Sequence, residues 1–181
     1  MDLDSQIADF LAEHRMWLLD RAALATMFVG TNLVALAVVA LSGLAIVIWL
    51  RNWRLVVGGG LALISSALVA EVVKDLVGRP RPAPSLALVF ASGSSMPSAI
   101  ATVTAAVAVA VFLAVAWPTA VVRRIAAAAL IAGVVWAGWC VLYLGVHWLT
   151  DVLAGWLLGG AIGLAATWVV SRLGMPSQAP S

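Results

Sequence analysis

Five apolar runs, each long enough to cross a lipid bilayer, constrain this chain more than any other feature of its sequence. A spanning helix needs about 20 apolar residues, because the hydrocarbon core is roughly 30 Å thick. The 181 residues are 64% hydrophobic and only 10% charged, whereas soluble domains are about half apolar and about a quarter charged. We therefore expect an all-α integral membrane protein, a bundle of five transmembrane helices. The predicted spans are residues 27–50, 55–77, 97–117, 125–146 and 152–171.

The N-terminal segment has a different pattern, typical of an amphipathic helix. Its apolar residues recur at three- and four-residue spacing, and its charged residues fall mostly on the other side. We predict one helix over residues 4–21 that lies in the membrane interface; a short soluble arm is the alternative. The predicted units are this interfacial helix (1–24), the membrane domain (25–174) and a short cytoplasmic tail (175–181). The apolar stripe is Ile7, Phe10, Leu11, Trp17 and Leu18, and the charged residues are Asp4, Asp9, Glu13, Arg15 and Asp20.

The basic residues predict the orientation of the bundle. The side reached after spans one, three and five carries five arginines without an acidic residue among them, and positive charge marks the cytoplasmic side. We therefore expect a protein of the plasma membrane, which in a bacterium is the inner membrane, with a cytoplasmic C-terminus. The opposite, extracytoplasmic face receives the chemically capable side chains. The five arginines are Arg51, Arg54, Arg123, Arg124 and Arg172.

Composition excludes several classes of function. Ten Lys and Arg against eight Asp and Glu are too few and too scattered for the basic stripe of a nucleic-acid binder. Cys140 is the only cysteine, so neither an internal disulfide nor a redox motif is expected. Because no polar stripe or pair of interrupted spans crosses the membrane, a channel or transporter is disfavoured. Glycines at 155, 159 and 163 repeat every four residues, which predicts close packing against another helix.

A cluster of charged residues lies where the second span ends. Glu71, Lys74 and Asp75 fall within the span, and Arg79 and Arg81 follow, separated by proline. Ionisable groups in a span usually face a partner or a watery cavity, and lysine and arginine both suit phosphate oxygens. We interpret the cluster as a phosphate-sized anion site, with a Glu71–Lys74 pair on one helix face. Snorkelling of Lys74 and attraction of the cations to anionic lipid are the alternatives.

Two further breaks supply polar groups to the same face. Pro97 and Ser98 precede the third span, where the free N–H groups of a helix start can hold an anion; a plain turn is the alternative. His147 and Asp151 follow the fourth span, four residues apart. The carboxylate can accept one imidazole N–H and leave the other ring nitrogen as a base or nucleophile.

Together these segments resemble the type 2 phosphatidic acid phosphatase family of integral-membrane lipid phosphate phosphatases. The first family motif is lysine, six residues, then Arg-Pro, and it matches Lys74 through Arg81-Pro82. Pro97-Ser98 matches the start of the second, Pro-Ser-Gly-His. In the third, Ser-Arg, five residues, His, three residues, Asp, the last two positions are His147 and Asp151. The resemblance covers residues 30–172.

The resemblance implies a mechanism without metal or cofactor. His147 would attack phosphorus to give a phosphohistidine, and Asp151 would orient it. The phosphate cradle would be Lys74, Arg81, Ser98 and the backbone of Ala99, with Arg79, Glu71 and Asp75 as auxiliary groups.

Two catalytic groups of the family pattern are missing from this sequence. Ile100 replaces the histidine that protonates the leaving group, and Cys140-Val141 replaces the Ser-Arg pair. A general acid contributes about 10²–10⁴-fold, so two interpretations stay open. One is a phosphohydrolase with a weakened site that favours lipid diphosphates, such as polyprenyl diphosphates, whose leaving group needs no proton. The other is a non-catalytic pseudophosphatase that binds phosphorylated lipid or serves as a subunit of another membrane enzyme. A membrane-protein partner or a homodimer is a further expectation.

Overall fold

The computed structural model describes residues 2–32, 41, 43, 45 and 52–173. Within those ranges the chain forms helices and no strand, which confirms the predicted all-α class. The elements are α1 (Leu3–Glu13), α2 (Trp17–Thr31), α4 (Trp53–Val77), the short 3₁₀ turn η1 (Pro84–Leu86), α5 (Ala99–Ala114), α6 (Ala120–Tyr143) and α7 (Leu149–Arg172).

Three of these helices are long and apolar enough to cross a membrane: α4, α6 and α7. They correspond to the predicted spans 55–77, 125–146 and 152–171, although α6 begins five residues earlier than predicted. It begins there because the Thr119 side chain accepts a hydrogen bond from the Val122 N–H and caps the helix. Most of the first predicted span, 27–50, lies outside the described residues, and its first residues belong to α2, which ends at Thr31 with Asn32 as its C-cap.

The third predicted span, 97–117, is longer than the helix that forms. α5 has 16 residues and is therefore about 24 Å long. It begins after Ser98, whose hydroxyl accepts from the Ala101 N–H, and it ends at Val115, where the backbone becomes extended ahead of Pro118. The residue before a proline disfavours helix and Pro118 itself cannot continue one, so hydropathy alone overestimated this element.

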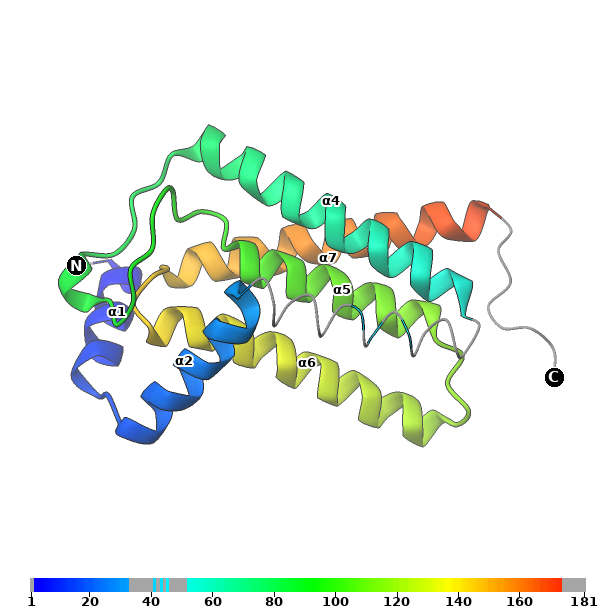
Figure 1. Cartoon of the computed structure of the whole chain (residues 1–181), viewed down its shortest axis with the longest axis horizontal. Coiled ribbons are helices and arrows are strands. Elements are labelled where there is room, and N and C mark those ends of the chain that lie inside the picture. Colours follow the sequence, from blue (N-terminus) through cyan, green and yellow to red (C-terminus); the bar gives the residue numbers. More distant parts are fainter. Residues whose placement is uncertain (1, 33–40, 42, 44, 46–51, 174–181) are drawn as a thin grey trace.

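α5 and α7 pack backbone to backbone, and the glycine repeat of α7 makes this contact. A Cβ at Gly155 would lie 2.8 Å from the Ser98 carbonyl oxygen, and one at Gly159 would overlap the Thr102 carbonyl. The predicted packing role of these glycines is confirmed. α4 packs on the same pair, so α4, α5 and α7 lie side by side in Figure 1.

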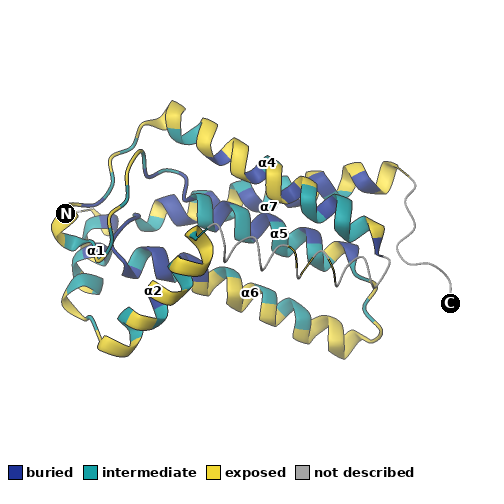
Figure 2. Cartoon of the chain, in the orientation of Figure 1, coloured by how far each residue is buried: buried dark blue, intermediate teal, exposed yellow. Residues whose placement is uncertain are grey.

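Small residues fill the inside of the bundle, and large apolar residues cover its outside. On α5 the wholly or nearly buried positions are mostly alanines, whereas Leu76 and Leu157 are about 80% exposed. Figure 2 shows the same division along α4, α6 and α7, with the exposed stretches on their outer faces. This arrangement suits a bundle whose surroundings are hydrocarbon, where small residues let helices approach closely.

The N-terminal region differs from the prediction of one helix over residues 4–21. Two helices form instead, because α1 ends at Glu13, with His14 as its C-cap, and the backbone of Met16 is extended. The Tyr143 hydroxyl accepts a hydrogen bond from the Met16 N–H and donates one to Asp20 at 2.6 Å, which holds the break against α6. Trp17 and Leu18 are exposed, as an interfacial helix requires, but Asp4 is buried.

Candidate functional site

Four segments that are distant in sequence meet at one end of the bundle. They are the end of α4 with the loop that follows it, the loop before α5, the start of α7, and the first turn of α1. Figure 1 shows this end beside α1, far from the last turn of α7. Three of the four segments carry the residues singled out from the sequence, so most of the predicted cluster does assemble.

His147 and Asp151 form a buried pair where α7 begins. The imidazole Nδ1 lies 3.4 Å from Asp151 Oδ2, and the same oxygen accepts a hydrogen bond from the Trp148 backbone N–H at 2.9 Å. Trp148 is the N-cap of α7, so the Asp151 carboxylate caps the first turn of this helix and contacts His147 with the same oxygen. The contact between Nδ1 and Oδ2 is long for a hydrogen bond. Because an ionised carboxylate only accepts, Nδ1 carries the proton and Nε2 keeps its lone pair.

Burial lowers the pKa of His147 below its ordinary value of 6.5. The hydrogen bond to Asp151 acts in the opposite direction, and the positive charges of Arg81 and Lys74 lower the pKa further. The side chain is only 7% exposed, so the cationic form is poorly solvated. His147 is therefore neutral at pH 7, the state that a nucleophile requires.

Arg81 faces the free nitrogen of His147. Its Nη1 lies 3.3 Å from Nε2 and donates to the Val146 carbonyl at 2.7 Å. Nε and Nη2 donate to backbone carbonyls of residues 92–94 at 3.1–3.3 Å. The guanidinium is thus held by backbone groups on two sides, and an oxygen of a phosphorus atom bound at Nε2 would lie within its reach.

Arg79 contacts the opposite side of Asp151. Its Nη1 donates to Asp151 Oδ1 at 2.6 Å and to the Thr150 hydroxyl at 2.6 Å, and its Nη2 donates to Asp4 Oδ2 at 2.7 Å. The loop reaches this position because Gly78 ends α4 in the left-handed conformation, with φ of 62°, which glycine adopts without strain. The sequence predicted Arg79 as an auxiliary group but not these partners.

Lys74 pairs with Glu71 at 2.7 Å, as predicted. The lysine side chain is 12% exposed and that of Glu71 is 64% exposed. Lys74 is therefore largely buried although its partner is exposed, and its positive charge acts on His147. Asp75 is exposed, and no side-chain hydrogen bond of the described residues involves it. Asp75 is not brought into the cluster.

Ser98 is wholly buried and tied to the start of α7. Its N–H donates to the Asp151 carbonyl at 3.0 Å, and its hydroxyl accepts from the Ala101 N–H at 3.4 Å as the N-cap of α5. Ala99, half-buried, is the first residue of α5. The positive end of α5 is therefore held next to the His147–Asp151 pair.

Ile100 and Val141, which the resemblance aligns with a histidine and an arginine of the family motifs, lie in apolar surroundings. Val141 is 1% exposed and belongs to a buried apolar cluster with Tyr143 and Leu144; Ile100 packs against the same cluster. His14 does not contribute an imidazole to the cluster, because it is exposed and stacks on Phe10 with ring centroids 4.2 Å apart.

Asp4 and Thr150 belong to the site but were missed by sequence reasoning. Asp4 accepts from the Thr150 N–H at 3.0 Å and from its hydroxyl at 2.5 Å. Burial alone would raise the pKa of Asp4, but the hydrogen bonds from Thr150 and Arg79 outweigh burial and lower it. A regular amphipathic pattern placed Asp4 on the solvent side, and nothing local indicates a contact with residue 150.

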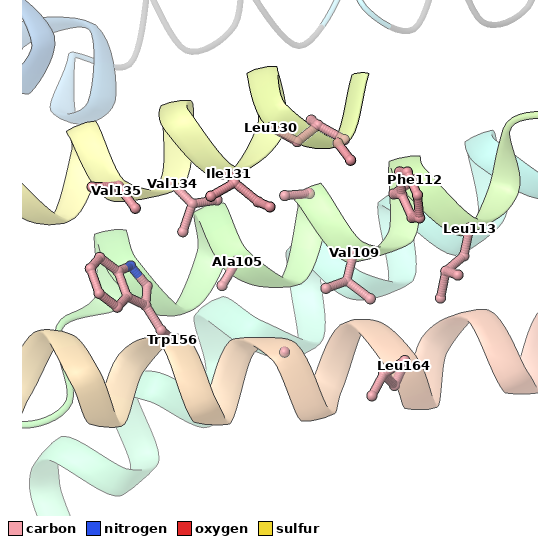
Figure 3. A pocket seen from close by; sticks show the side chains of 13 residues that line it. Ala105, Val109, Phe112, Leu113, Leu130, Ile131, Val134, Val135, Trp156 and Leu164 are labelled. Carbon is pink, nitrogen blue, oxygen red and sulfur yellow. The ribbon is translucent and has the colours of Figure 1, made fainter. Parts of the chain in front are cut away.

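An apolar cavity lies away from this cluster, between α5, α6 and α7. Its volume is about 520 Å³, and it runs from Trp156 past Val109 to Phe112 and Leu164 (Figure 3). Such a lining accommodates hydrocarbon and offers no ligand for a phosphate. As for metals, no group of three or more His, Cys, Asp or Glu side chains in the described part of the chain could hold an ion.

Fold and site together define a helical membrane protein that carries a buried histidine–aspartate pair among arginine and lysine side chains. The chain belongs to the PAP2 superfamily, whose family model matches residues 55–175. The sequence-based recognition of the family is thereby confirmed.

Two solved structures share the fold. One is a transmembrane PAP2-type phosphatidylglycerolphosphate phosphatase from Bacillus subtilis, with a TM-score of 0.77 and 23% identity over 94% of this chain and 85% of that one. The other is LpxE from Aquifex aeolicus, with a TM-score of 0.72 and 22% identity over 92% of this chain and 95% of that one. A search of curated protein sequences gave no significant match.

Proposed function

We propose that the chain is a membrane phosphohydrolase that acts on a lipid phosphate or diphosphate through a phosphohistidine on His147. One observation carries the proposal: a neutral histidine presents Nε2 to a fixed arginine while a buried carboxylate holds Nδ1. The membership of the PAP2 superfamily and the name of the Bacillus relative, a phosphatidylglycerolphosphate phosphatase, support it.

The proposed reaction has two steps. His147 Nε2 attacks phosphorus, a P–N bond forms, and the leaving group departs with the electron pair of its bond to phosphorus. The ring becomes positively charged, and Asp151 stabilises it at Nδ1. A water oxygen then attacks phosphorus, the P–N electron pair returns to the imidazole, and inorganic phosphate leaves. Arg81, Lys74 and the N-terminus of α5 neutralise the phosphoryl oxygens, which is most of what phosphoryl transfer needs.

The leaving group decides which substrate this site handles best. A phosphomonoester expels an alkoxide, which needs a proton, but Ile100 stands where the family supplies its acid. A lipid diphosphate expels a phosphate monoester, a much weaker base that leaves without a proton. We therefore propose a preference for lipid diphosphates of the polyprenyl or phospholipid type.

The proposed setting is a five-span bundle in the plasma membrane with the site on the extracytoplasmic face. The arginine-rich ends of two helices support this orientation. Arg123 and Arg124 lie near the start of α6 and Arg172 is the last residue of α7, and these helix ends lie at the end of the bundle opposite the start of α7 (Figure 1).

A second function is favoured by one observation. Val141 is buried among apolar residues, and Ile100 packs against the same cluster. Packed apolar side chains therefore stand where an efficient phosphatase of the family has a histidine and an arginine. A pseudoenzyme that only binds phosphorylated lipid would keep the same anion-site residues as an active phosphatase.

Hydrolysis by the purified protein in liposomes decides between these functions. Matched pairs of substrates, a polyprenyl monophosphate with its diphosphate and phosphatidic acid with its pyrophosphate, are assayed by phosphate release. We expect kcat/KM for the diphosphate to exceed that for the monophosphate by about 10²-fold, the range of a missing general acid. Equal rates, or faster monophosphate hydrolysis, contradict the substrate preference. Binding without turnover of any substrate, lost in Arg81→Ala, supports the second function.

A further inference from the structure

We infer that Asp4 of α1 is a positioning residue for the His147–Asp151 pair and that it acts through Arg79. The inference rests on the proposed function, which makes this pair the centre of the chemistry. It assigns a role at the site to the N-terminal helix, which the sequence placed in the membrane interface.

The geometry is a row of alternating charges. Asp4 Oδ2 pairs with Arg79 Nη2 at 2.7 Å, and Arg79 Nη1 pairs with Asp151 Oδ1 at 2.6 Å. The other oxygen of Asp151 faces His147. Arg79 therefore fixes one oxygen of Asp151 and leaves the second for the imidazole. Asp4 in turn fixes the guanidinium, since the two carboxylates bind different nitrogens of the same plane.

Thr150 ties the row to the start of α7. Its hydroxyl contacts both Arg79 and Asp4, and its backbone N–H donates to Asp4. Asp4 is 7% exposed and Asp151 wholly buried, so water screens these charges little. A neutral residue at position 4 would leave the charge of Arg79 compensated by Asp151 alone.

The consequence at His147 has a definite sign. With Asp4 ionised, much of the negative charge of Asp151 remains available to the imidazole. Loss of the Asp4 charge makes the surroundings of His147 more positive and disfavours imidazolium, which also forms during the proposed reaction. The charged groups that act directly on His147 are Asp151 of α7, Arg81 of the loop after α4 and Lys74 of α4. Arg79 acts on His147 through its ion pair with Asp151, and Asp4 acts through Arg79.

A purely structural role for Asp4 predicts the opposite sign. If Asp4 only anchors α1 on Thr150, its loss loosens the end of the bundle and lets water reach His147. Because burial is what chiefly lowers the pKa of His147, better hydration would raise that pKa toward its ordinary value. The direction of the change therefore separates the two roles.

The test is a titration of His147 by NMR of the full chain in detergent micelles or nanodiscs. The chain has only two histidines, so His14→Gln assigns the signals. We expect Asp4→Asn to move the His147 midpoint to lower pH by about half a pH unit. Asp9→Asn, the same substitution on the same helix at a residue without a side-chain partner among the described contacts, leaves the midpoint where it is. Asp4→Ser serves as a second neutral variant, because its hydroxyl can still accept from Thr150.

Kinetics and a double variant complete the test. In the wild-type background, Asp4→Asn should lower kcat about tenfold with KM within about twofold, by analogy with partners that orient metal-bound histidines. In an Arg79→Gln background the same substitution should change the midpoint and kcat much less. An unchanged or raised midpoint in both neutral variants overturns the inference. The midpoints decide this even if the protein hydrolyses no lipid phosphate, the result that would count against the proposed function instead.

Discussion

Gly159→Ala should destabilise the bundle, although alanine is the better helix former. The added Cβ would overlap the Thr102 carbonyl and lie 3.0 Å from the Ala105 Cβ, where apolar atoms normally rest 3.5–4.0 Å apart. α7 must therefore move away from α5 by about 1 Å, a gap that forfeits a quarter to a half of each contact's attraction. Overpacking of this kind costs about 1–3 kcal/mol.

The neighbouring residue provides the matched control. A Cβ at Gly160 would have nothing within 4 Å, so Gly160→Ala keeps the packing and gains up to about 1 kcal/mol of helix propensity. In thermal unfolding of the purified protein, Gly159→Ala should lower Tm by roughly 5 °C, and Gly160→Ala should leave it unchanged or raise it. Equal Tm values for the two variants would refute the close α5–α7 contact on which the position of Ser98 beside Asp151 depends.

Three further predictions concern the site. Ile100→His should raise turnover of lipid monophosphates at least tenfold by restoring a general acid, with a smaller gain on diphosphates. If neither Ile100→His nor the double variant with Val141→Arg raises turnover in protein shown to be folded, the pocket differs from that of the family. Arg81→Lys should lower kcat/KM by about tenfold or more, because one ammonium cannot bind the carbonyls of residues 92–94 and Val146 and also face His147. If the Arg81→Lys variant has the same kcat/KM as the wild type, the guanidinium geometry is dispensable. Activity should be full at pH 7 and fall with acid at a midpoint below 6.5, since only neutral His147 attacks and its pKa is lowered. Stability should fall earlier, as the pH drops from about 6.5 to that midpoint, because the imidazole binds a proton more readily in the unfolded chain than in the folded one. A midpoint above 6.5 in the kcat/KM profile argues against His147 as the nucleophile.

Hydropathy predicted the long helices because each apolar run of sufficient length forms a helix in lipid. It could not predict the length of α5, which is set by the cap at Ser98 and the proline after Trp117. Spacing also predicted the Glu71–Lys74 and His147–Asp151 contacts, since both pairs are local in sequence.

Contacts between distant segments were not predictable from the sequence. Asp4 looks like any acid on the polar face of an amphipathic helix, and its role appears only when α1 docks on the start of α7. The break at Met16 has the same origin, because a hydroxyl 127 residues away holds it. Arg79 could be assigned to the site by charge, but its partners depend on this docking.

Trapping of a phosphohistidine tests the central claim most directly. The protein is mixed with a lipid diphosphate, quenched in alkali, where a P–N bond survives, and analysed by peptide mass spectrometry. The account predicts one phosphoryl group on His147, retained in His14→Gln and lost together with turnover in His147→Gln. Hydrolysis that continues in His147→Gln, or turnover by the wild type without a phosphorylated His147 at any quench time, would contradict it.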